Sequence, residues 1–198
     1  MRSILLTLAI SLAAVLSTTT STAFAHTLPE AGDISDWQTV GDATWGFNEN
    51  VLTNENNEGD GFILAPGQYE NFILSVEFFV EAQTNSGVFV RCQNAEQISP
   101  ITCLEANIWD EHPKQEFRTG SIVARAFPPM AHVSTVGKWN TMQVRANGTT
   151  VEVRVNGELT ATLDDVELGA GFIALQRFET GKVQFRNISI TELDHANE

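Results

Sequence analysis

The sequence has 198 residues, of which 25 are acidic and 11 are basic, so its formal net charge is −14 at pH 7. This charge argues against nucleic acids and anionic membranes as partners, because a surface that binds phosphate groups has to be basic. It suits an exported protein that binds neutral ligands, and the length is enough for one domain with a core of its own.

Residues 1–25 have the pattern of a signal peptide. Arg2 supplies a positive charge, residues 4–16 form an apolar run, and Ala23-Phe24-Ala25 is a small-x-small cleavage site. The apolar run is too short to span a bilayer, and no later stretch is apolar enough to form a transmembrane helix. We therefore expect cleavage before His26, export to the periplasm or the medium, and a single domain over residues 26–198.

The rest of the chain shows the two-residue alternation of β-strands and no sustained helical period. The clearest strand is 72–80, in which every second residue from Phe72 to Val80 is apolar. The expected strands are 37–40, 43–47, 51–52, 62–65, 72–80, 87–92, 103–109, 120–127, 142–146, 151–155, 158–163, 171–177 and 182–193. This pattern predicts an all-β sandwich or barrel with almost no helix.

Two Asn-Gly pairs, at 147–148 and 156–157, predict tight turns between strands. In the last expected strand the apolar positions change phase between Phe185 and Ile188, which predicts a bulge at Arg186-Asn187. Three tryptophans are expected in the core. They are Trp37, Trp45 and Trp139.

Cys92 and Cys103 are the only cysteines, and they flank a polar loop of ten residues. In an exported protein this arrangement predicts a disulfide bond, and the spacing does not fit a zinc motif. If both cysteines face each other on regular strands, Arg91 lies on the side of the sheet opposite Glu105. A bulge at one cysteine would bring Arg91 and Glu105 to the same side.

Expected strand 103–109 carries two different faces. Leu104, Ala106 and Ile108 lie on one face, and Glu105, Asn107 and Trp109 lie on the other. A carboxylate, an amide and an indole on one face suit a groove that handles sugars, with Asp110 and His112 just beyond. From spacing alone a catalytic role stays open, because structural networks also gather carboxylates.

Seven short motifs follow one another in an order typical of a known family. They are NSGVFVR at 85–91, E-x-N-x-x-D at 105–110, TGSI at 119–122, GKWN at 137–140, VNG at 155–157, IALQ at 173–176 and FRNI at 185–188. Over about residues 37–193 the chain resembles the 3-keto-disaccharide hydrolase domain family. This resemblance implies a concanavalin A-like jelly-roll sandwich of two antiparallel sheets. Asn107 and Leu104 depart from the family pattern of Gln and an aromatic residue, which bears on the substrate more than on the reaction class.

The resemblance also implies cleavage of glycosides that are already oxidised at C3. A ketone at C3 acidifies the C2 proton, a base removes that proton, and the enolate expels the C1 substituent. We expect Glu105 or Asp110 to be the base and Arg91 to stabilise the enolate, although Arg91 could instead be a structural partner of Glu105. The expected substrate-binding residues are Asn107, Trp109, His112, which could also be the acid, and Gln176.

Two other functions compete with this interpretation. A non-catalytic carbohydrate-binding module is the main alternative, because jelly rolls serve both purposes. A laminarinase-type glucanase is disfavoured, because its motif Glu-x-Asp-x-x-Glu is replaced here by Glu105, Asn107 and Asp110. The sequence contains no zinc-protease, serine-hydrolase, phosphate-loop or dinucleotide motif. It shows no requirement for a cofactor, and a divalent metal remains an alternative. The expected partner is a carbohydrate or a modified sugar.

Overall fold

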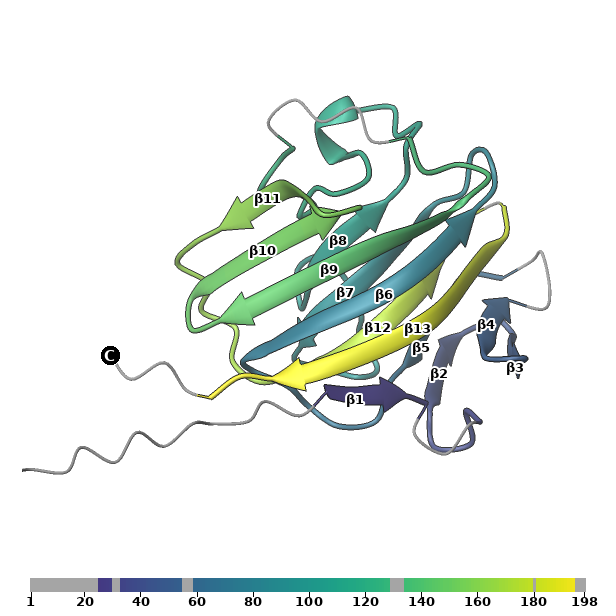
Figure 1. Ribbon diagram of the computed structural model, residues 1–198, viewed down its shortest axis with the longest axis horizontal. Coiled ribbons are helices and arrows are strands. Elements are labelled where there is room, and N and C mark those ends of the chain that lie inside the picture. The colour runs from purple at the N-terminus through teal and green to yellow at the C-terminus, as the bar shows by residue number, and fades with distance from the viewer. Residues whose placement is uncertain (1–24, 30–32, 55–58, 129–133, 180, 195–198) are drawn as a thin grey trace, which may run out of the picture.

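A computed structural model of the protein describes residues 25–29, 33–54, 59–128, 134–179 and 181–194. Two antiparallel β-sheets pack face to face, which confirms the jelly-roll sandwich (Figure 1). The only helical element in these ranges is one 3₁₀ turn, Gln115–Phe117. None of the described residues belongs to a helix that could cross a membrane. The expected signal peptide lies outside the described residues, except for Ala25.

The larger sheet has eight strands, and the smaller one has five. The larger sheet runs in the order β11 (Glu158–Leu163), β10 (Thr150–Val155), β9 (Trp139–Asn147), β6 (Phe72–Val80), β13 (Val183–Glu192), β4 (Val51–Asn54) and β3 (Trp45–Asn48), with β1 (Ala25–Leu28) paired to β13. The smaller sheet runs in the order β2 (Gln38–Gly41), β5 (Gly61–Leu64), β12 (Phe172–Arg177), β7 (Ser86–Cys92) and β8 (Leu104–Ile108).

The hydrophobic core lies between the two sheets. The alternating apolar side chains of β6 are buried there, as predicted, and they pack with Leu104, Ala106 and Ile108 from β8. Trp37 and Trp45 are buried in the same core, which confirms two of the three tryptophan predictions.

The predicted turns and the predicted bulge are present in the larger sheet. Asn147 pairs with Thr150 across the first Asn-Gly turn, and Val155 pairs with Glu158 across the second. The pairing of β13 with β6 shifts between Arg186 and Ser189, and Asn187 has a φ of 49°. This extra residue changes which side chains of β13 face the core.

Two predictions about the sheets are wrong. Residues 120–127 form turns and isolated bridges in place of a strand, because Ile122 and Ala126 exchange backbone hydrogen bonds and fold the segment back on itself. Trp139 is not in the core, because the neighbouring Asn140 takes the buried position in β9. The Trp139 ring lies instead against Phe79 and beneath the guanidinium of Arg186. The distance from Cζ of Arg186 to the centroid of the Trp139 ring is 3.9 Å.

Strands β7 and β8 of the smaller sheet are buried on both faces. Every residue of β7 and of β8 is buried, although only every second one faces the larger sheet. A second apolar cluster covers the opposite face, which we call the outer face of the five-stranded sheet. It contains Leu64, Phe89, Cys92, Cys103 and Ala174, with Ile98 packed against it.

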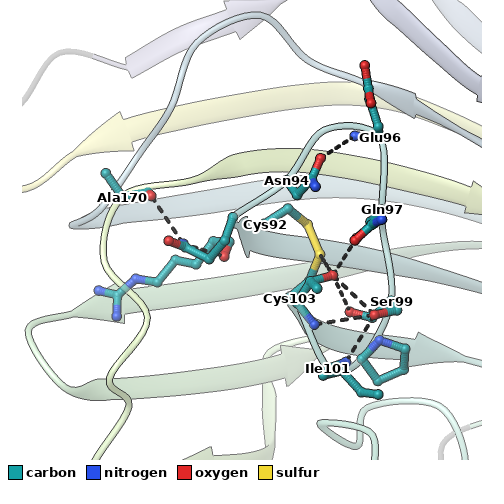
Figure 2. The surroundings of a disulfide bond; sticks show 12 residues. Cys92, Asn94, Glu96, Gln97, Ser99, Ile101, Cys103 and Ala170 are labelled. Atoms are coloured by element: carbon teal, nitrogen blue, oxygen red, sulfur yellow. Dashed lines mark hydrogen bonds between the residues drawn. A yellow bond between two sulfur atoms is a disulfide. The ribbon is translucent and has the colours of Figure 1, made fainter.

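A disulfide bond joins Cys92 to Cys103, as predicted, at the base of loop 93–102 (Figure 2). Both cysteines are fully buried in the outer cluster. Such a bond is typical of proteins outside the cytoplasm. The loop is therefore tied to the outer face of the sheet at both of its ends.

Candidate active site

The candidate site lies on the outer face of the five-stranded sheet, where strand register sets the order of the side chains. One row across the sheet consists of Leu64, Ala174, Phe89 and Glu105. The next row, two residues further along each strand, consists of Phe62, Gln176, Gly87 and Asn107. A third row follows, with the bridged pair Asn85 and Phe178, and with Trp109 just past the end of β8. Polar groups therefore gather in the second and third rows, beside Glu105.

A pocket of about 350 Å³ opens over these rows. Its size is at the lower end of the range for small-molecule sites. It is lined by Phe62, Asn85, Phe89, Ile98, Ser99, Pro100, Glu105, Asn107, Trp109, His112, Val123, Gln176 and Phe178. The structure thus brings together Glu105 and all four predicted substrate-binding residues in one concavity.

Glu105 is the one ionisable carboxyl group among the lining residues. The residue is only 7 % exposed. Burial raises the pKa of its carboxyl group from 4.5 to about 8, and burial is the only cause of the shift. None of the described residues donates a hydrogen bond that would stabilise the charged form. Glu105 is therefore a buried acid whose pKa lies close to neutral pH, a property common in catalytic groups.

Gly87 lies on β7 directly beside this carboxyl group. A Cβ atom at position 87 would lie 3.1 Å from Oε1 of Glu105 and 3.1 Å from the Phe89 ring. Because Gly87 has no side chain, the Glu105 carboxyl group can occupy the space next to it.

The two amide side chains of the second row differ in what they offer a ligand. The Asn107 side chain already forms hydrogen bonds to backbone groups. Its Nδ2 donates to the Phe117 carbonyl, and its Oδ1 accepts from the Ile108 N–H at 2.9 Å. Gln176 is 8 % exposed, and its Oε1 has no hydrogen-bond partner among the described residues. A buried polar atom without a partner is costly, so Oε1 of Gln176 is available to accept a hydrogen bond in the pocket.

His112 and Trp109 form the aromatic end of the pocket, with ring centroids 4.4 Å apart. Nδ1 of His112 accepts a hydrogen bond from the Lys114 N–H at 3.0 Å. The neutral imidazole therefore carries its proton on Nε2, which makes Nε2 a hydrogen-bond donor. An indole and an imidazole N–H at one end suit a ligand with both a flat apolar face and hydroxyl groups.

Arg91 does not reach the pocket. Val90 and Arg91 together lie opposite the single residue Ile173, and Arg91 has a φ of 52°, which defines a bulge next to Cys92. This bulge turns the Arg91 side chain away from the Glu105 face. Its guanidinium donates to the backbone carbonyls of Glu70, Leu168 and Gly148 at 2.7–3.0 Å.

Asp110 is also engaged outside the pocket. Its Oδ2 accepts from the Thr135 N–H at 2.6 Å, and its Oδ1 accepts from the Thr135 hydroxyl at 2.9 Å. The carboxylate therefore ties the end of β8 to the segment that leads into β9.

A comparison with protein families decides the classification. The family model described as the 3-keto-alpha-glucoside-1,2-lyase-like domain matches residues 25–191. The chain belongs to this family. No curated protein matches the chain.

Solved structures described as putative glycosyl hydrolases and as a carbohydrate-binding module share the fold. A "putative glycosyl hydrolase" from Parabacteroides distasonis is 26 % identical, with a TM-score of 0.67 over 79 % of this chain and 99 % of that one. A second protein of that description and organism is 21 % identical, with a TM-score of 0.72 over 86 % and 94 %. A carbohydrate-binding module from Bacillus subtilis is 18 % identical, with a TM-score of 0.59 over 79 % and 95 %.

Several lining residues of this lyase-like domain escaped the sequence analysis. Asn85 and Phe89 share the outer face with Gly87, so alternation along β7 could have identified them. Phe62 comes from β5 and Phe178 follows the end of β12, and their place at the pocket depends on strand order and register, which the sequence does not reveal.

No group of three His, Cys, Asp or Glu side chains suited to a metal ion occurs in the described ranges. At the pocket itself, Glu105 and His112 are the side chains of these types among the lining residues.

Proposed function

We propose that the protein cleaves glycosides oxidised at C3, with Glu105 as the base that removes the C2 proton. One observation carries this proposal: a lone, buried carboxyl group with a pKa raised to about 8 lines a pocket of sugar-ring scale. Membership of the 3-keto-alpha-glucoside-1,2-lyase-like family supports the same reaction class.

The raised pKa suits proton abstraction from carbon. A carboxylate that is poorly solvated is a stronger base, and catalysis is most efficient when the pKa of the base lies near the working pH. The Glu105 carboxylate takes the proton from C2, and the C2–H electrons form an enolate with the C3 ketone. The enolate then restores the ketone, a double bond forms between C1 and C2, and the C1–oxygen bond breaks. The departing oxygen takes up one proton, so the step needs no oxidant or reductant.

The other lining groups provide binding and proton donation in this scheme. Gln176 and Asn85 supply amide groups for sugar hydroxyls, and Trp109 offers a ring face. The Nε2–H of His112 is a donor for the enolate oxygen or the departing oxygen. Arg91 and Asp110 keep structural roles, because their polar atoms are bound to backbone groups and to Thr135.

A substrate panel tests the proposed function. The protein is incubated with several 3-keto-glucosides and with their unoxidised parents, and release of the aglycone is measured. Release from the keto forms alone is the expected result. Release from the parents would indicate an ordinary glycosidase, and binding without any release would indicate a carbohydrate-binding module, so either outcome contradicts the proposal.

Gly87→Ala tests whether the position of the Glu105 carboxyl group matters. The added methyl group would press on Oε1 of Glu105, and a displacement of the catalytic group by about 1 Å can cost about 10²-fold in rate. We expect a 10- to 100-fold loss of kcat, measured as aglycone release, in a protein that is still folded by circular dichroism. Unchanged kcat would mean that the carboxyl group need not occupy this space.

A further inference from the structure

We propose that loop 93–102 forms the leaving-group half of the pocket and that it selects glycosides with an apolar aglycone over disaccharides. This inference rests on the proposed function and names its substrate class. It follows from where the loop lies relative to Glu105 and from what the loop presents to the pocket.

Glu105 lies between two chemically different halves of the pocket. In one direction along β8, the next outer-face residue is Asn107, followed by Trp109 and the polar rows. In the other direction it is Cys103, about 7 Å away by strand geometry, where loop 93–102 is attached. A sugar bound by Gln176 and Asn85 with its C2 at Glu105 leaves the loop side of the pocket for the substituent on C1.

The loop offers this substituent an apolar wall. Its lining residues are Ile98, Ser99 and Pro100, and Phe89 lines the same pocket from β7. Ser99 is the one polar side chain among the three, and its hydroxyl is already used. It lies 3.1 Å from the Thr102 hydroxyl and accepts from the N–H groups of Ile101 and Thr102 at 3.3 Å.

An apolar wall discriminates between leaving groups by desolvation. The hydroxyl groups of a second sugar would lose water here without gaining protein partners, which is costly. A hydrocarbon ring would lose only unfavourable contact with water, which is a gain proportional to the area buried. The wall therefore favours an alkyl or aryl aglycone.

The wall is preformed. The disulfide bond fixes both ends of the loop, and the Cys103 N–H donates to the Ser99 carbonyl at 2.9 Å (Figure 2). From outside the loop, Nη2 of Arg125 donates to the Pro100 carbonyl at 3.1 Å. A wall that is already ordered costs little conformational entropy when a ligand binds.

The test compares two 3-keto-glucosides that differ only in the leaving group, cyclohexylmethanol or glucose. An alkyl alcohol is no better a leaving group than a sugar hydroxyl, so a preference for it has to come from binding. We expect kcat/KM to be at least about tenfold higher for the cyclohexylmethyl compound. Calorimetry with the unoxidised parents is expected to show the same preference in affinity, independently of turnover.

Ile98→Ser removes the apolar contact, and Ile101→Ser is its matched control, because Ile101 is in the same loop but is 84 % exposed and does not line the pocket. Ile98→Ser is expected to abolish most of the tenfold preference, and Ile101→Ser is expected to leave it unchanged. Equal effects of both variants, or no preference in the wild-type protein, would overturn the inference. If Ile98→Ser does not fold, the ratio of the two kcat/KM values in the wild-type protein is enough to test the inference.

These outcomes are distinct from failure of the proposed function. If neither keto substrate is cleaved, the proposed reaction is wrong, and the affinities of the parent compounds still decide whether the loop selects an apolar group. If both are cleaved equally well and the parents bind equally well, the reaction stands and the selectivity is wrong.

Discussion

Replacing Glu105 by Gln is expected to reduce turnover of a 3-keto-glucoside by roughly 10²–10⁴-fold, the usual contribution of a general base. Gln keeps the shape of the side chain and can still form hydrogen bonds, but it cannot take up a proton. In the wild-type protein kcat/KM should rise with pH and level off above about 8, because the base works only when it is ionised. Aglycone release measured from pH 5 to 9 gives both results.

Glu77→Gln is the matched control for this variant. Glu77 lies on β6 in the other sheet, where it pairs with Arg186 at 2.7 Å, and it does not line the pocket. Its loss should leave turnover unchanged. Full activity in Glu105→Gln would instead transfer the role of base to another group, such as His112, and contradict the assignment of Glu105.

Glu105→Gln is also expected to stabilise the fold at neutral pH and to have little effect at pH 4. The carboxyl group has a pKa of about 8 in the folded protein and about 4.5 when exposed. Below pH 4.5 it is protonated in both states, so it imposes no penalty. Between pH 4.5 and 8 the unfolded chain releases the proton while the folded protein keeps it, so wild-type stability declines as pH rises. At pH 7 this difference is about 3 kcal/mol.

Urea denaturation of both proteins at pH 4, 5, 6 and 7 measures this difference directly. Other carboxyl groups contribute equally to both proteins, so the gap between the two curves reports on Glu105 alone. Glu77 should behave in the opposite way, because hydrogen bonds from Asn187 and Arg186 lower its pKa. Glu77→Gln should therefore lose stability above pH 4.5 relative to wild type. A constant gap between Glu105→Gln and wild type would contradict the raised pKa.

The sequence correctly predicted several structural features that depend on a single strand or segment. Alternation in β8 predicts that Leu104, Ala106 and Ile108 enter the core and that Glu105 and Asn107 face away from it, as observed. The disulfide could be predicted because the sequence has only two cysteines and an expected export signal. The bulge in β13 could be predicted because the apolar positions of that strand change phase.

Features that depend on neighbouring strands could not be predicted in this way. The bulge at Arg91 is set by its pairing with β12, and only that pairing shows that the guanidinium leaves the Glu105 face. Trp139 is apolar enough for a core, but the register of β9 gives the buried position to Asn140. The pKa of Glu105 depends on the whole enclosure of the pocket, which no single segment encodes.

The burial of β7 and β8 on both faces has a consequence for protein engineering. A substitution in either strand disturbs either the core between the sheets or the outer cluster, so a library of variants made there would lose many members to misfolding. Ile98 and Pro100 line the same pocket from loop 93–102, and loops tolerate change better than strands do. Directed evolution toward new substrates should therefore randomise these loop positions and leave the strands intact.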